Sequence, residues 1–355
     1  MPGSTPSESG LAAKTAGSSP LADRPTRRIE GKPAVIVTRR LLPETERRMD
    51  ELFHVSLNPT DAALNRPQLI AAMRNCDVLV PTVTDRIDAE IIAAAGDRVK
   101  LIASFGAGVD HIDLAAARAR KIIVTNTPGV FTDDTADMTM ALIIAVPRRF
   151  VDGGRVLREG NWQGWSPSTM LGHRLGGKLL GIVGMGRIGQ AVAHRARAFG
   201  LSIAYHNRHR LPEALENILG ARWEPDLDTL VRDADILTLH APATTNGLPV
   251  IDARRIGLMK PDAYIVNTAR GGLIDENALI EALEADRIGG AGLDVYAHEP
   301  AIDPRLLSLA NVSLLPHLGS ATFEGRAASG EKVIANIRFW ADGHRPPDQV
   351  LEGWA

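Results

Sequence analysis

The chain has 355 residues, with 40 Lys and Arg, 42 Asp and Glu, and a net charge of −2 at pH 7. This near balance gives no electrostatic basis for binding nucleic acid or a membrane surface. A hydrophobic content of 45% and a charged content of 23% are typical of a soluble globular protein, and the length predicts about two domains. The lone cysteine, Cys76, cannot form an internal disulfide, which fits a reducing compartment, so we expect a cytoplasmic protein.

Residues 1–32 are rich in Ser, Pro, Gly and Ala and predict a disordered tail. They lack the apolar middle of a secretory signal. No apolar stretch of the sequence approaches the ~20 residues that a membrane helix needs. The same tail would also arise from a start codon upstream of the native one.

From residue 32 onward, short β-branched runs alternate with helical patterns, which is typical of parallel sheets with helices on both faces. The predicted fold is therefore α/β. In the order of the chain, we expect strands at 34–37, 77–80, 101–105 and 122–125, a helix over 132–150, strands at 179–183, 202–206, 236–240, 263–268, 292–295 and 312–315, and a closing helix over 321–340.

The helix over 132–150 has end signals of its own. Thr132 and the pair Asp133–Asp134 are candidate capping residues, because anionic side chains suit a helix N-terminus. Pro147 should end or kink this helix, since proline lacks the backbone N–H. Trp162 and Trp165 follow in a loop.

A glycine-rich turn joins the expected strand at 179–183 to a helix that begins at Arg187. Its glycines are Gly184, Gly186 and Gly189. A pyrophosphate could lie on the free N–H groups at that helix N-terminus, which includes Ile188. The G-x-G-x-x-G pattern alone is weak, and a chance glycine turn is the alternative. The preceding strand and following helix favour dinucleotide binding.

The strand at 202–206 ends where NAD-binding proteins carry an Asp or Glu for the adenosine ribose. This chain has Asn207 there, followed by Arg208 and Arg210. Cationic donors would favour a 2′-phosphate, so we predict NADP as the preferred cofactor. A solvated basic loop with NAD bound is the alternative.

Three further residues suggest the chemistry: Arg270 in N-T-A-R-G-G, Glu299 in D-V-Y-A-H-E-P and His317 in L-P-H-L-G-S. An arginine can hold a carboxylate with two parallel hydrogen bonds. A histidine can carry a proton near neutral pH, and a neighbouring carboxylate favours its charged form. Behind a dinucleotide turn, this set suits hydride transfer to a 2-oxo acid.

Taken together, these contexts resemble the D-2-hydroxyacid dehydrogenase family, and most closely its glyoxylate and hydroxypyruvate reductases. The resemblance covers nearly everything after Lys32. It implies a catalytic triad of Arg270, Glu299 and His317. It also implies a Rossmann-type cofactor domain (129–318) inserted into a flavodoxin-like substrate domain (33–128 and 319–355).

The resemblance also implies further contacts. Cofactor contacts would come from His240, Ala241, Pro242, Thr268, Ala269, Asp294 and Gly319, with a helix-capping role as the alternative for Asp294. The substrate carboxylate would bind the backbone of Ala107 and Gly108, in a loop that could otherwise be an ordinary glycine-rich turn. After Pro242 the chain departs from the family pattern, which puts side-chain contacts from 246–249 to the adenosine in doubt.

The resemblance implies a small 2-oxo acid, glyoxylate or hydroxypyruvate, as the substrate. The sequence predicts no bound metal, since His and Cys do not cluster at ligand spacing. Other members of the family that use NAD, such as phosphoglycerate and formate dehydrogenases, are alternatives, and so is a nucleotide-sensing corepressor with the same fold. The apolar helix and the two tryptophans within 132–171 predict the interface of a homodimer.

Overall fold

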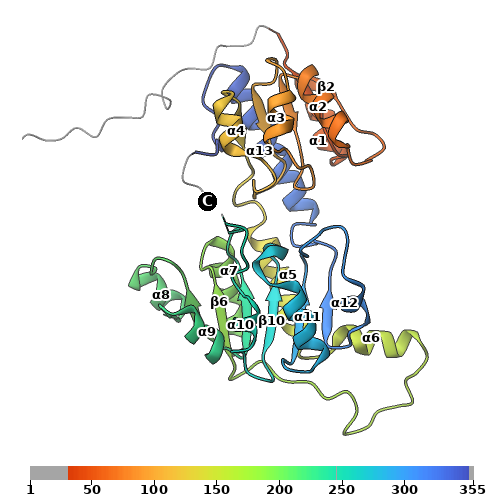
Figure 1. Cartoon of the computed structure of the whole chain (residues 1–355), viewed down its shortest axis with the longest axis vertical. Helices are drawn as coiled ribbons and strands as arrows, with labels where there is room; N and C mark the ends of the chain where they lie inside the picture. The colour runs from red at the N-terminus through yellow and green to blue at the C-terminus, as the bar shows by residue number, and fades with distance from the viewer. Residues whose placement is uncertain (1–30, 245, 352–355) are drawn as a thin grey trace, which may run out of the picture.

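The computed structural model describes residues 31–244 and 246–351. It forms two lobes, each built on one parallel sheet (Figure 1). Residues 1–30 of the predicted tail lie outside the described residues. We refer to the lobes as the substrate and cofactor domains, with the limits proposed from the sequence.

The substrate domain contains a five-stranded parallel sheet in the described chain, with the order β2-β1-β3-β4-β5. Its strands are near-continuous apolar runs such as Val78–Val80, because helices cover both faces of the sheet. The chain order reverses between β1 and β3, which is where doubly wound sheets bind ligands. The elements are β1 (Ala34–Val37), α1 (Pro43–Leu52), β2 (His54–Ser56), α2 (Arg66–Asn75), β3 (Val78–Val80), α3 (Ala89–Ala94), β4 (Leu101–Ala103), α4 (Leu114–Ala119) and β5 (Ile123–Thr125).

Within the described residues, the cofactor domain contains a seven-stranded parallel sheet. Its strand order is β12-β11-β10-β9-β6-β7-β8. Its order reverses between β6 and β9. The elements are α5 (Thr132–Ala145), α6 (Phe150–Arg158), β6 (Leu179–Val183), α7 (Arg187–Ala198), β7 (Ser202–His206), α8 (Glu213–Leu219), β8 (Ala221–Trp223), α9 (Leu227–Asp233), β9 (Ile236–Leu239), α10 (Ala253–Ile256), β10 (Tyr264–Asn267), η1 (Gly271–Leu273), α11 (Glu276–Glu284), β11 (Gly290–Leu293), α12 (Pro304–Ser308) and β12 (Val312–Leu314).

The last helix, α13 (Phe323–Ala341), returns the chain to the first lobe (Figure 1). Its apolar side chains join the core under β1, β3 and β4, and they are Val333, Ile334, Ile337 and Trp340. The first lobe is therefore built from both ends of the described chain, and the second lobe from its middle.

The predicted α/β class with two parallel sheets is confirmed. Three strands, β1, β6 and β7, have the expected bounds. Two three-residue strands, β2 and β8, were not predicted; both lie at sheet edges, where exposed polar residues interrupt the apolar pattern.

The helix expected over 132–150 is instead two helices, because α5 ends at Ala145, shortly before Pro147, and α6 starts at Phe150. The predicted cap of α5 is also wrong. Its N-cap is Phe131, which makes no side-chain cap hydrogen bond.

Candidate active site

The glycine-rich turn after β6 is shaped by close backbone contacts. A Cβ on Gly184, whose φ is +98°, would lie 2.7 Å from the carbonyl carbon of His240 and 2.8 Å from the amide nitrogen of Ala241. A Cβ on Gly189 would lie 2.3 Å from the Gly184 oxygen. Gly184 and the backbone of His240 and Ala241, far apart in sequence, therefore lie against each other.

The turn also leaves room for a ligand. A Cβ on Gly186 would meet no atom within 4 Å. Gly186 is the N-cap of α7 and no side chain caps that helix, so the N–H groups of its first turn, from Arg187 to Gly189, have no capping side chain. This arrangement fits the pyrophosphate of a dinucleotide, which binds at the positive end of a helix dipole.

Asn207 lies at the end of β7, beside this turn. Its Oδ1 accepts a hydrogen bond of 2.7 Å from the Met185 N–H. Because Met185 can only donate there, the amide must place its oxygen toward the turn and its NH₂ group away from it. Asn207 therefore offers donors, whereas the acid of an NAD site offers acceptors.

The two arginines that follow differ in their surroundings. Arg210 donates through Nε and Nη2 to Glu216, with distances of 2.7 to 3.2 Å, and its guanidinium lies 5.8 Å from the Trp223 ring centroid. Within residues 31–244 and 246–351, the exposed Arg208 side chain has no recorded partner. The expectation that both arginines are available to a phosphate is thus supported by geometry for Arg208 alone.

Arg270, Glu299 and His317 follow three neighbouring strands, β10, β11 and β12. The carboxyl ends of parallel strands meet at one edge of the sheet, so the structure brings the three predicted residues together. His317 adopts a φ of +56°, which is uncommon for a residue with a side chain. Such strain is found at functional sites when the surroundings hold it in place.

The side chains of His317 and Glu299 are in direct contact, as the sequence-based pairing requires. The distance from His317 Nδ1 to Glu299 Oε2 is 2.8 Å, and Glu299 Oε1 accepts from the Tyr296 N–H at 3.0 Å. Partial burial of Glu299 acts to raise its pKa, but the hydrogen bonds from His317 and the Tyr296 N–H and the nearby positive charges together outweigh it, so the pKa lies below its ordinary value. With Nδ1 held by a carboxylate, Nε2 is the nitrogen left for a substrate.

Asp294 has a supporting role rather than a helix cap. It is fully buried, and its two oxygens accept from the N–H groups of Leu318 at 2.6 Å and Gly319 at 2.7 Å. Burial raises its pKa. The cap of α13 is Thr322, which accepts from the Gly325 N–H, so the capping alternative for Asp294 is wrong. The Asp294 carbonyl also accepts from the His317 N–H, so Asp294 holds the backbone from His317 to Gly319.

The turn that carries Arg270 is held by the buried side chain of Asn267. Asn267 Nδ2 donates to the Arg270 carbonyl at 2.8 Å, and its Oδ1 accepts from the Ala269 N–H at 3.0 Å. A Cβ on Gly271 would lie 2.0 Å from the Tyr296 backbone, so the Arg270 and Glu299 turns pack directly on each other. Only glycine permits this approach.

Hydroxyl groups join the turn at Thr268 to the start of α5 and to the His317 loop. Thr268 Oγ1 lies 2.7 Å from Thr139 Oγ1, which donates to the Thr135 carbonyl. Thr135 Oγ1 in turn donates to the Gly319 carbonyl at 3.0 Å. The sequence analysis did not identify Thr135 or Thr139, because hydroxyls on a helix are usually solvated or bonded to their own helix.

The loop over 104–110 carries the predicted substrate contacts. The Asn126 side chain donates to the Ala107 carbonyl at 2.7 Å, and the Thr127 N–H to the Gly106 carbonyl at 2.9 Å. Within the described part of the chain, the N–H groups of Ala107 and Gly108 have no recorded acceptor. Two free amide donors in succession can bind an anion, as predicted.

The same loop contacts the cofactor domain. Arg270 Nε lies 3.0 Å from both carboxylate oxygens of Asp110, and Nη2 lies 3.0 Å from Oδ1. A Cβ on Gly108 would lie 1.8 Å from Nη2, so the guanidinium rests on the glycine. The contact between Asp110 and Arg270 was not predicted, because the two residues are 160 positions apart in the sequence.

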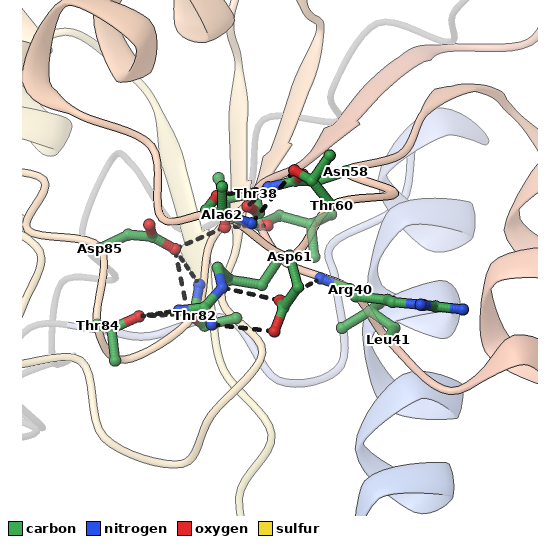
Figure 2. Close-up of polar contacts among 12 residues, drawn as sticks. Thr38, Arg40, Leu41, Asn58, Thr60, Asp61, Ala62, Thr82, Thr84 and Asp85 are labelled. Carbon is green, nitrogen blue, oxygen red and sulfur yellow. Dashed lines mark hydrogen bonds and ion pairs between the residues drawn. The ribbon is translucent and has the colours of Figure 1, made fainter.

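A polar cluster supports this loop from the substrate domain (Figure 2). The buried Asp85 accepts from Thr38 Oγ1 at 2.5 Å and from the Thr82 N–H at 2.8 Å, which joins the segments after β1 and β3. The next residue after Thr82, Val83, lies against the loop, since a Cβ on Gly106 would be 2.7 Å from its Cγ1.

Asp61 extends the cluster toward β2. It accepts from Arg39 Nε and the Arg40 N–H, both at 2.9 Å, and the hydrogen bond from Arg39 lowers its pKa. The cluster's side chains are bonded to one another, which indicates a structural role.

Residues 31–244 and 246–351 contain no cluster of His, Cys, Asp or Glu that could hold a metal ion. None of the helices over these residues is long and apolar enough to cross a membrane. Cys76 is buried, which raises its pKa to about 12 and favours the inert thiol.

The geometry therefore defines a two-domain α/β protein with a nucleotide turn and a histidine–carboxylate–arginine site at its strand ends. Residues 140–319 match the family model for the NAD-binding domain of D-isomer specific 2-hydroxyacid dehydrogenases. The chain is 44% identical over 323 residues to the glyoxylate reductase of Thermococcus litoralis, which covers 90% of this chain and 97% of that protein. It belongs to the D-isomer specific 2-hydroxyacid dehydrogenase family.

Two solved structures share the fold over nearly their whole length. The glyoxylate reductase of Paecilomyces thermophila superposes with a TM-score of 0.81 at 33% identity, covering 91% of this chain and 99% of that one. The NADPH-dependent glyoxylate/hydroxypyruvate reductase of Sinorhizobium meliloti, solved with NADP and malonate, also gives a TM-score of 0.81 at 33% identity. Its coverage is 91% of this chain and 98% of that one.

Proposed function

We propose that this protein reduces a small 2-oxo acid, glyoxylate or hydroxypyruvate, to the 2-hydroxy acid, with NADPH as the preferred cofactor. The observation that carries the proposal is the 2.8 Å contact between His317 and Glu299 at the strand end next to that of Arg270. His317, held by Glu299, can deliver a proton to a substrate whose carboxylate is bound by the neighbouring Arg270. The relatives named glyoxylate reductase support the choice of acid.

The proposed chemistry divides between two side chains. The nicotinamide cofactor supplies the hydride when bound at the glycine-rich turn. Arg270 holds the acid and stabilises the negative charge that develops on the carbonyl oxygen. His317 gives the proton on Nε2 to that oxygen, while Glu299 holds Nδ1 and favours the protonated ring. The free N–H groups of Ala107 and Gly108 bind the substrate carboxylate from the other domain.

The proposed preference for NADPH depends on the donors at the end of β7. Asn207 turns its NH₂ group away from the Met185 N–H, and Arg208 is exposed without a recorded partner in the described chain. Both are donors, and no acid stands at this position to repel a 2′-phosphate. NAD remains the alternative cofactor if these groups face solvent in the complex.

The test is a set of initial rates for glyoxylate, hydroxypyruvate, pyruvate and phenylpyruvate, each with NADPH and with NADH. We expect the highest kcat/KM with glyoxylate or hydroxypyruvate and NADPH. A preference for NADH would contradict the cofactor assignment alone. Binding of a nicotinamide cofactor without turnover of any of the four acids would contradict the reductase and favour a nucleotide-sensing protein.

We also propose a homodimer, and a location in the cytoplasm. In the described chain, α6 and the loop after it project from the cofactor domain (Figure 1). They expose large apolar side chains: Phe150, Val151, Leu157, Trp162, Trp165 and Leu171. Trp162 is 59% exposed and Trp165 is 85% exposed, so neither side chain covers the core of its own monomer.

The proposed interface differs in one respect from the sequence-based expectation. Met140, Leu142 and Ile143 of α5 are buried in the core of the cofactor domain, so they are not available to a partner. The remaining apolar surface lies on α6 and its loop. A dimer in light scattering at micromolar concentration would support the proposal, and Trp165→Glu should then shift the species toward monomer. A wild-type monomer would contradict it.

A further inference from the structure

Asp110 lies in the loop over 104–110 of the substrate domain, but its carboxylate contacts the cofactor domain. Both of its oxygens lie 3.0 Å from Arg270 Nε, and Oδ1 lies 3.0 Å from Nη2. The pair is only partly open to solvent, with side-chain exposures of 45% for Asp110 and 31% for Arg270. Partial burial acts to raise the pKa of Asp110, yet the hydrogen bond and the positive charge of Arg270, with smaller contributions, together outweigh it and the pKa is lowered.

The remaining donors of Arg270 are limited. Nη1 donates to the Ala269 carbonyl at 2.7 Å, so the guanidinium is held on two sides. A guanidinium has five N–H groups. Within the described residues, at least two of them, on the terminal nitrogens, have no recorded acceptor. An incoming carboxylate can therefore bind the terminal nitrogens while Asp110 keeps the Nε side.

The position of Gly108 adds to this arrangement. The guanidinium rests against its Cα, because a Cβ there would lie 1.8 Å from Nη2 and 2.9 Å from the Asp110 Oδ1. Gly108 is also one of the two residues whose N–H groups face the proposed substrate. The loop thus presents backbone donors for the substrate and a carboxylate for the arginine from one short segment.

We propose that Asp110 is a positioning residue, whose carboxylate holds the Arg270 guanidinium across the domain boundary so that its terminal N–H groups stay directed at the 2-oxo acid. The inference rests on the proposed function and deepens it. It makes the orientation of Arg270 depend on the substrate domain. Without Asp110, Arg270 keeps its charge and can still attract the 2-oxo acid. The orientation of its guanidinium, however, is no longer fixed.

The experiment compares Asp110→Asn and Asp110→Ala with wild type. The control is Asp97→Asn, which removes an exposed carboxylate from Arg120 in the same domain, just before the start of β4. Because misplacement by about 1 Å can cost ~10²-fold in rate, we expect kcat for glyoxylate to fall about 10- to 100-fold in both Asp110 variants. KM should stay equal or fall, and the control should match wild type. An unchanged kcat, with or without a lower KM, would overturn the proposal, since Asp110 would then be neutral or a competitor of the substrate.

A double-mutant cycle separates positioning from a structural role in the loop. In an Arg270→Ala background, the guanidinium that Asp110 holds is absent, so Asp110→Asn should cause no further loss of kcat. An equal loss in both backgrounds would show that Asp110 acts on the loop and would overturn the inference.

A second readout needs no turnover. Phenylglyoxal modifies arginine side chains, and the modification of Arg270 can be followed by mass spectrometry of its peptide. We expect faster modification in Asp110→Asn than in wild type or Asp97→Asn. An equal rate would overturn the proposed contact. If wild type reduces none of the four 2-oxo acids, the proposed function fails, while this rate still decides whether Asp110 holds Arg270.

Discussion

The two glycine-rich loops of the molecule differ in what their glycines make room for. In the cofactor domain, Gly184 and Gly189 make room for backbone of the same domain, from His240, Ala241 and the turn itself. In the substrate domain, Gly108 makes room for the guanidinium of Arg270, which belongs to the other domain. The nucleotide turn is therefore complete within one domain, whereas the substrate loop is complete only when two domains meet.

This difference separates two kinds of variant. Changes in the glycine-rich turn or in the segment after β7 that holds Asn207 and Arg208 should alter cofactor binding alone. Changes to Arg270, Glu299 or His317, or in the loop over 104–110, should alter turnover and leave cofactor binding intact.

The largest effect is expected for His317→Ala. General acid catalysis typically contributes ~10²–10⁴-fold, so kcat for glyoxylate should fall by that factor. The dissociation constant of NADPH, measured by fluorescence titration, should stay within about twofold, because His317 is proposed to act on the carbonyl group. A loss of NADPH affinity as large as the loss of kcat would contradict this separation.

Gly108→Ala and Gly186→Ala form a matched pair that tests the comparison directly. A Cβ on Gly108 would displace the Arg270 guanidinium, so kcat/KM for the 2-oxo acid should fall about 10²-fold with NADPH affinity unchanged. A Cβ on Gly186 meets nothing and its φ is −80°, so folding should be unaffected. It would nevertheless intrude on the space of the pyrophosphate, so the dissociation constant of NADPH should rise. If both variants changed the affinity for NADPH equally, the two glycine-rich loops would not have separate roles in cofactor and substrate binding.

The strand ends could be predicted from the sequence because each proposed catalytic residue follows a recognisable apolar run. Arg270, Glu299 and His317 then meet because β10, β11 and β12 are neighbours in a parallel sheet. The contacts of Asp110 with Arg270 could not be predicted, because they depend on how the two domains pack.

The pairing of Arg210 with Glu216 could not be predicted either. The acid lies on α8, and Tyr205 joins the same group, with its OH donating to Glu216 at 2.6 Å. Sequence reasoning treated Arg208 and Arg210 as equivalent because they are two positions apart. Their surroundings, which only the fold reveals, distinguish them.

This distinction leads to a prediction about the cofactor. A charge-assisted hydrogen bond is worth about 1.5–3 kcal/mol, so Arg208→Ala should raise KM for NADPH roughly 10- to 100-fold while NADH kinetics hardly change. Asn207→Asp should shift the preference toward NADH, since a carboxylate accepts from the ribose and repels the phosphate. Arg210→Ala serves as the control. Because it removes the partner of Glu216, this variant should lower the melting temperature and leave the affinity for NADPH unchanged. A loss of NADPH affinity with an unchanged melting temperature would make Arg210 the phosphate ligand.

The smallest effect is expected for Glu299→Gln, and it is a shift along the pH axis. In the wild type the pKa of Glu299 lies below its ordinary value, so its carboxylate stays ionised throughout the neutral range and favours a protonated His317. Reduction needs that proton, so the rate falls as pH rises and the ring loses it. A neutral amide favours the protonated ring less, so the fall in kcat/KM should move to lower pH.

The measurement is the pH–rate profile of glyoxylate reduction for wild type and Glu299→Gln. Glu276→Gln serves as a control, because Glu276 accepts from the Ala297 N–H and does not contact the histidine. If kcat/KM of Glu299→Gln is lower at every pH but the midpoint of the profile is unchanged, Glu299 orients the His317 ring without favouring its protonated form.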